Sequence, residues 1–115
     1  MGLTGVQAYQ EALDLFDSGH FFEAHEALEF LWLKSTGNDR NFLKGLIQLA
    51  VCYHHAEVGN ATGTQNLGTR ARLRLAPYAP AYGGIDVDQL LANLLPAPSD
   101  LPKDPRIPRL LNGMG

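Results

Sequence analysis

Apolar residues recur along most of this chain at the three- and four-residue intervals that are typical of an amphipathic α-helix. We predict that a first helix begins at Thr4 and stops at Gly19, with an apolar face formed by Val6, Tyr9, Leu13 and Phe16. Residues 21–35 continue the same period and end in a Thr-Gly-Asn turn. These two segments therefore predict a pair of helices joined by a short turn.

Three more segments show the helical period and have residues suited to cap a helix at their start. We predict a third helix from Asn38 or Asp39 to Gly59, a fourth from Asn60 or Thr62 to Ala76, and a short fifth over residues 86–95 capped by Asp86. Pro77 ends the fourth helix, and the proline and glycine residues of segment 78–84 predict a loop.

The fold class that follows is all-α, a compact bundle of four to five helices with a proline-rich C-terminal tail. A length of 115 residues suits one domain, which we place over residues 1–95. Five prolines between residues 96 and 108 exclude a regular helix there. The tail, 96–115, is then either a mobile end or a segment draped over the bundle through Leu101, Ile107, Leu110 and Leu111.

Composition and charge limit the partners and the cellular location that we expect for the protein. A net charge of -3 makes nucleic acid an unfavoured partner, although a local basic surface stays open. The longest apolar run, 46–53, is interrupted by Gln48 and is too short to cross a bilayer, so we expect no membrane partner. With a single cysteine, Cys52, and no leader-like start, we expect a cytoplasmic protein.

Two histidines and a glutamate fall inside the apolar arcs of the second and third helices. On a helical wheel His25 and Glu29 lie among aromatic residues, one turn apart, and His54 lies within the wide apolar arc of the third helix. That wide arc predicts that the third helix is central. A buried carboxylate needs partners, so we expect a buried His/Glu cluster.

One interpretation of this cluster is a metal site. His25, Glu29 and His54 would supply two nitrogen ligands and one oxygen ligand, a set that suits Zn²⁺ or Fe²⁺ with a position left for water. Glu26 or Glu57 would then either support a ligand by a hydrogen bond or serve as a general base. The function that follows is a metal-dependent hydrolase.

The other interpretation is a hydrogen-bond network that fixes how the helices dock, in a module that binds a partner. Phe30 and Leu33 fall outside the apolar arc, so an exposed patch and a homo-oligomer are expected. Arg70, Arg72 and Arg74 form either a solvated helix face or a contact for an anion or a nucleic acid. No small-molecule ligand, reaction or enzyme class follows from these residues.

Two sequence blocks resemble a small bacterial and archaeal family known as domain of unknown function 309. The first is the run GHFFEAHEALE over residues 19–29, followed by Trp32, and the second is FLKGLIQLA over residues 42–50, followed by His54. The similarity extends over about residues 9–95, and the proline-rich end lies outside it.

The resemblance implies a compact all-helical bundle, and some members have been labelled metal-dependent hydrolases on the same His/Glu motif. The motif positions that carry over to this chain are His25, Glu26, Glu29, Trp32, Gln48 and His54. One departure is Thr64, where an alanine is usual in the family.

Overall fold

The computed structural model describes residues 2–95 and 100–110 of the chain, and the predicted all-α fold is confirmed. The helices in these ranges are α1 (Gln7–Asp17), α2 (Phe21–Lys34), α3 (Gly37–Glu57), α4 (Ala61–Leu75) and α5 (Val87–Leu94). Two short 3-10 turns, η1 (Leu3–Gly5) and η2 (Ala76–Tyr78), and two strands, β1 (Ala81–Tyr82) and β2 (Ile85–Asp86), complete the structure. None of the described helices combines the length and the apolar character needed to span a membrane.

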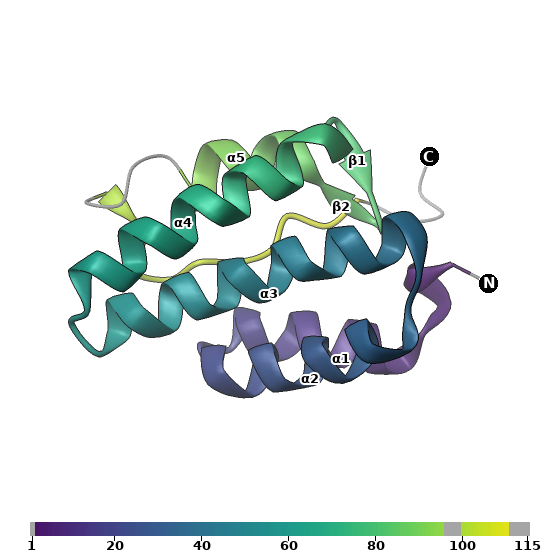
Figure 1. Ribbon diagram of the computed structural model, residues 1–115, viewed down its shortest axis with the longest axis horizontal. Coiled ribbons are helices and arrows are strands. Elements are labelled where there is room, and N and C mark those ends of the chain that lie inside the picture. Colours follow the sequence, from purple (N-terminus) through teal and green to yellow (C-terminus); the bar gives the residue numbers. More distant parts are fainter. Residues whose placement is uncertain (1, 96–99, 111–115) are drawn as a thin grey trace.

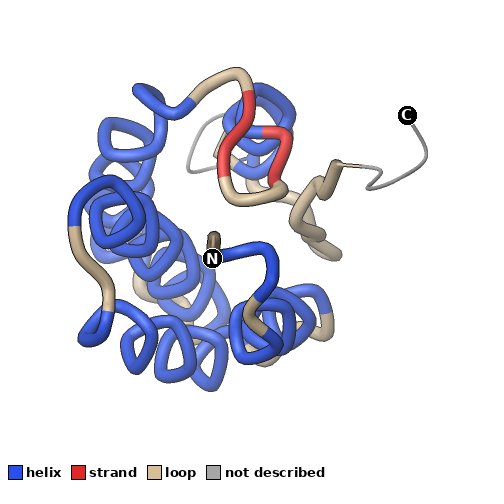
Figure 2. Tube along the Cα trace, turned by 90° about the vertical axis from the view of Figure 1, so that its right-hand side faces the viewer, coloured by secondary structure: helices blue, strands red, loops and turns tan. Residues whose placement is uncertain are grey.

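Helix α3 lies at the centre of the bundle, as its wide apolar arc predicted (Figure 1). It packs against α2 on one side and against the antiparallel α4 on the other, and α1 covers α2. The end-on view in Figure 2 shows the helices surrounding a shared interior. The α3 residues buried there include Phe42, Leu43, Leu46, Leu49 and Tyr53.

Side-chain caps set the starts of α4 and α5 as predicted. The Asn60 side chain accepts a hydrogen bond from the Gly63 N–H at 2.9 Å, and Asp86 accepts one from the Gln89 N–H at 3.0 Å. The prediction that the first helix begins at Thr4 is wrong. Residues 3–5 form a 3-10 turn, and α1 follows without a side-chain cap.

The predicted loop over residues 78–84 is instead the end of η2 followed by β1 and the turn of a small antiparallel hairpin. Ala81 pairs with Asp86, and the two residues at the turn, Gly83 and Gly84, have φ values of +57° and +74°. Positive φ at both central positions is the requirement of a type I′ hairpin turn, which glycine meets without strain. Strands of two residues are too short to show an alternating pattern in the sequence.

Residues 100–110 run back along the bundle and contact its N-terminal part (Figure 1). Ile107 is buried, and its N–H donates to Asp17 Oδ1 at 2.7 Å, while the Leu110 N–H donates to the Gly84 carbonyl at 2.9 Å. This segment is therefore draped over the helices, although the Leu110 side chain is exposed. Residues 96–99 and Leu111 lie outside the described part, and the domain boundary at residue 95 stays a prediction.

Candidate functional site

The predicted burial of Glu29 is wrong. Its side chain is 53% exposed, and its Oε2 lies 3.4 Å from His25 Nε2. The buried face of α2 includes Phe21, Ala24 and Leu28. Glu29 lies outside this face and points toward water. The physical reason is that α2 carries apolar residues on nearly every side, so the wheel does not show which arc the neighbouring helices cover.

Both histidines pack against the Phe22 ring, but His25 lies near Glu29 whereas His54 lies near Glu57. The Phe22 ring centroid is 5.8 Å from that of His25 and 5.5 Å from that of His54. His54 Nδ1 lies 3.8 Å from Glu57 Oε1. Among the described residues, α2 and α3 therefore show no buried His/Glu cluster.

Metal binding at His25, Glu29 and His54 stays a prediction that the geometry does not support. Within residues 2–95 and 100–110, no three or more His, Cys, Asp or Glu side chains are grouped so that they could hold a metal ion. Glu26, predicted as one candidate for the general base, is exposed.

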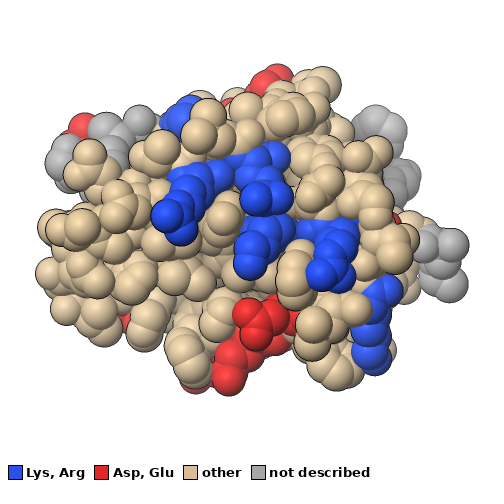
Figure 3. Space-filling view, viewed as in Figure 1, with Lys and Arg blue, Asp and Glu red and all other residues tan. Residues whose placement is uncertain are grey.

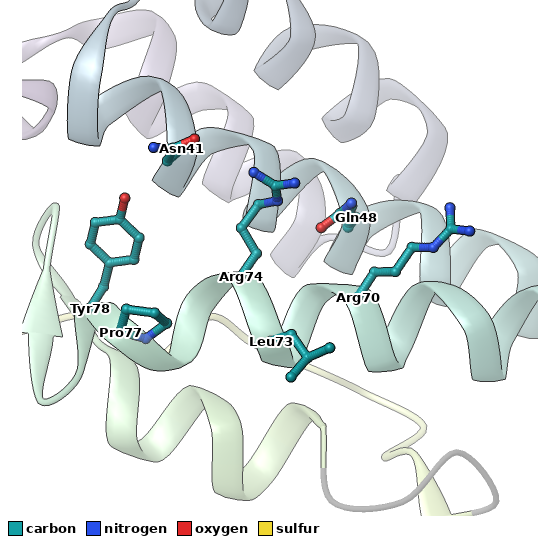
Figure 4. Close-up of a pocket in the computed structure, with 7 residues that line it drawn as sticks. All are labelled: Asn41, Gln48, Arg70, Leu73, Arg74, Pro77 and Tyr78. Atoms are coloured by element: carbon teal, nitrogen blue, oxygen red, sulfur yellow. The ribbon is translucent and has the colours of Figure 1, made fainter.

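A groove of about 780 Å³ lies between α3 and α4, on the face shown in Figure 4. We call it the α3–α4 groove. Its lining residues are Asn41, Gln48, Arg70, Leu73, Arg74, Pro77 and Tyr78. This lining contains two guanidinium groups, two side-chain amides and a phenol, and it contains no carboxylate.

Gln48 is the buried polar residue of the groove. Its side chain is only 9% exposed, and its Oε1 has no hydrogen-bond partner among the described residues. Figure 4 shows this amide between the side chains of Arg70 and Arg74. A buried polar atom without a partner costs about 1–3 kcal/mol, which is the kind of cost that a ligand removes by supplying the missing hydrogen bond.

The three arginines of α4 have different surroundings. Arg70 and Arg74, one helical turn apart, line the groove. Arg72 lies on the other side of α4, where its Nη2 donates to the Leu91 carbonyl at 3.0 Å. The two predicted roles therefore apply to different arginines. Arg72 supports the packing of α5, and of the three only Arg70 and Arg74 are available to an anion in the groove.

Two further cations extend the positive surface beside the groove. Arg40 lies over the Trp32 ring with 3.7 Å from its guanidinium carbon to the ring centroid, and Lys44 Nζ lies 5.0 Å from the same centroid. Arg40 also donates to the Trp32 carbonyl at 3.0 Å. Figure 3 shows Lys and Arg side chains gathered along this face of α3 and α4.

The close approach of α3 and α4 depends on Gly45. A Cβ atom at this position would lie 2.6 Å from Leu75 Cδ2 and 2.7 Å from its Cγ, closer than side-chain carbons pack. Gly45 lies on α3 between Asn41 and Gln48, the two residues that this helix contributes to the groove. The glycine thus fixes the distance between the two walls.

Cys52 is buried and is not part of the groove lining. Its Sγ donates to the Thr64 carbonyl at 3.3 Å, and burial raises the pKa of the thiol to about 11. Because the thiolate is the reactive form, this cysteine is poorly suited to act as a nucleophile.

The comparisons with known proteins cover the part of the chain from α1 into α4 and beyond. A family model described as Domain of unknown function (DUF309) matches residues 9–67. The chain belongs to this family. The resemblance seen in the blocks of residues 19–29 and 42–50 is therefore confirmed.

One relative, from Aquifex aeolicus (strain VF5), is named an uncharacterized protein. It is 30% identical over 90 residues, which cover 77% of this chain but 27% of the relative. The chain thus spans about a quarter of the length of that relative. The family match includes Gln48 and ends before Arg70 and Arg74.

Proposed function

We propose that this domain of unknown function 309 protein is a binding module that receives an anionic group in the α3–α4 groove. The observation that carries the proposal is that Arg70 and Arg74 line the groove around Gln48, whose buried Oε1 has no hydrogen-bond partner among the described residues (Figure 4). Arginine suits this role because its planar group offers several N–H donors to one anion.

The charge distribution supports the proposal. The whole chain has a net charge of -3, so a positive groove is a local feature and not a consequence of a basic protein. The lining residues include no carboxylate to neutralise Arg70 and Arg74, and Arg40 and Lys44 lie nearby on Trp32. A surface lined by one sign of charge raises the local concentration of counter-ions of the opposite sign.

The proposal has a direct test in titration calorimetry with inorganic pyrophosphate at low ionic strength. We expect the protein to bind pyrophosphate, and we expect the double variant Arg70→Ala/Arg74→Ala to lose at least about tenfold in affinity. Added salt should weaken the binding because the groove is open to solvent.

Arg106→Ala is the matched control, since Arg106 is an exposed arginine in segment 100–110 outside the groove. Its affinity for pyrophosphate should equal that of the unmodified protein. Equal binding by the double variant and this control, or no binding by any of the three, would contradict the proposal.

A second candidate function is self-association through the outer side of α2. Phe30 is 55% exposed and Leu33 is 66% exposed, as expected for an apolar patch that a second copy of the chain could cover. Light scattering should give twice the monomer mass, and Phe30→Ser/Leu33→Ser should return the mass to that of one chain. A monomer in the unmodified protein removes this candidate.

The free thiol of Cys52 and the absence of a second cysteine from the sequence favour a reducing compartment, so we propose a cytoplasmic location. A metal-dependent hydrolase at His25, Glu29 and His54 remains the alternative with less support, because Glu29 is exposed.

A further inference from the structure

We infer that the anion received by the α3–α4 groove is the phosphate of a free nucleotide; this inference rests on the function proposed above and names its ligand class. A phosphate alone satisfies only part of the groove. Guanidinium groups donate hydrogen bonds, and phosphate oxygens at neutral pH accept them. Gln48 Oε1 is an acceptor, so the phosphate oxygens that accept from the guanidinium groups cannot satisfy it and it needs a donor.

The partner that Gln48 requires is a hydroxyl or amino group close to the anion. An amide side chain presents a donor and an acceptor side by side, and both are used only by a ligand that carries both kinds of group. A ribose phosphate provides them, with phosphate oxygens for Arg70 and Arg74 and a neighbouring hydroxyl for Gln48 Oε1. Sulfate carries no donor, and the one donor that HPO₄²⁻ carries is on the phosphate group itself and not on a neighbouring group.

The other end of the groove has a different chemistry. Beyond Arg74 the lining consists of Pro77, Tyr78 and Asn41, which together offer an apolar surface, an aromatic ring and a second amide (Figure 4). Asn41 is exposed and Tyr78 is half-buried. A flat group with polar edges, such as a nucleobase, matches this end, because bases stack on aromatic rings and pair with side-chain amides.

The dimensions favour a single nucleotide over a nucleic-acid strand. Arg70 and Pro77 are seven positions apart on α4 and η2, which corresponds to roughly 10 Å along a helix. A volume of about 780 Å³ is in the range of small-molecule sites. The net charge of -3 disfavours the many phosphate contacts that a strand requires.

The test compares adenosine 5′-monophosphate with inorganic phosphate, two ligands of similar charge, by calorimetry on the full chain. We expect the nucleotide to bind at least tenfold more tightly than phosphate, ribose 5-phosphate to fall between them, and adenosine without phosphate to bind weakly. Gln48→Leu should keep the binding of phosphate and reduce the advantage of the nucleotide to less than about threefold.

Asn41→Ala is a second variant at an exposed position, chosen so that the test does not depend on a change in the core. It should lower the affinity for the nucleotide and leave the affinity for ribose 5-phosphate unchanged. Arg106→Ala again serves as the control and should bind all of these ligands as the unmodified protein does.

The outcomes separate the two proposals. Equal affinities for the nucleotide and phosphate overturn the inference and leave the anion-binding function standing. No binding of either ligand, or of pyrophosphate, removes both. Tighter binding of a single-stranded oligonucleotide than of the mononucleotide, lost in Gln48→Leu, also overturns the inference, because the partner is then a nucleic acid.

Discussion

Arg109 Nη2 lies 2.8 Å from Asp17 Oδ2, which joins the C-terminal segment to the last residue of α1 across 92 positions of sequence. The other carboxylate oxygen of Asp17 accepts from the Ile107 N–H at 2.7 Å. Asp14 adds a second carboxylate to Arg109 at 2.9 Å. One half-buried aspartate therefore holds both the backbone and a side chain of segment 100–110 against the bundle.

The substitution Asp17→Ala should lower the free energy of unfolding by about 1–3 kcal/mol, because it leaves a backbone N–H and a guanidinium without their shared partner. Urea unfolding followed by circular dichroism measures this change. Asp104→Ala is the control, since its contact with Arg106 is long, at 3.5 Å, and both side chains are exposed. The control should cost less than about 0.5 kcal/mol, and equal effects of the two variants would contradict the account.

Two glycines in neighbouring helices give a matched pair for the α3–α4 contact. Gly45→Ala should destabilise the protein by about 1–3 kcal/mol, because the new Cβ meets buried Leu75 at 2.6 Å. In Gly68→Ala the nearest atom is Cys52 Sγ at 3.4 Å, an ordinary contact, so the better helix propensity of alanine should raise stability by about 0.5–1 kcal/mol. Thermal unfolding of both variants tests the sign of each change, and a stabilised Gly45→Ala would show that the helices are further apart than described.

Protein purified without a histidine tag should contain no stoichiometric zinc or iron. The reason is geometric, because Phe22 packs against both imidazoles and Glu29 faces water. Elemental analysis, before and after addition of Zn²⁺ followed by dialysis, checks this expectation. One metal ion per chain that disappears in His54→Ala would restore the metal interpretation of His25, Glu29 and His54.

Stability should fall as the pH rises above about 9. Burial raises the pKa of Cys52 from 9.0 to about 11, and the hydrogen bond to Asp39 is the main cause that raises the pKa of Tyr82 from 10.0 to about 12. Between each pair of values the folded chain keeps a proton that the unfolded chain has lost, so the free energy of unfolding decreases with pH.

Urea titrations at pH 8 and at pH 10.5 measure this loss of stability. The variant Cys52→Ala should show a smaller decrease between the two pH values, because it lacks one of the groups concerned. An unfolding free energy that stays constant to pH 10.5 in the unmodified protein would show that these groups titrate alike in the folded and unfolded chains.

The fold was predictable to the extent that it depends on local signals. Helical periodicity and the side-chain caps at Asn60 and Asp86 give the order of the helices and two of their starts. The hairpin of β1 and β2 was missed because each strand has two residues, and its only local signal is the Gly83–Gly84 pair. The contact of Asp17 with Arg109 was beyond prediction because nothing local links positions so far apart.

The candidate site was less predictable because it depends on which helix faces are covered. Glu29 and Gln48 show this in opposite directions, since the helical wheel placed Glu29 in the core, whereas Gln48 is a polar residue that interrupts the apolar run 46–53. In the structure Glu29 is exposed and Gln48 is buried beside α4. The missed signal was Gly45, a small residue one turn before Gln48 that allows another helix to approach closely.

The most direct test of the central claim is a backbone amide chemical-shift titration of the full chain with inorganic pyrophosphate. The account predicts saturable shifts confined to residues 41–48 of α3 and 70–78 of α4 and η2, which carry the lining of the α3–α4 groove. Saturable shifts centred instead on His25 and His54, or no saturable shifts at all, would contradict it.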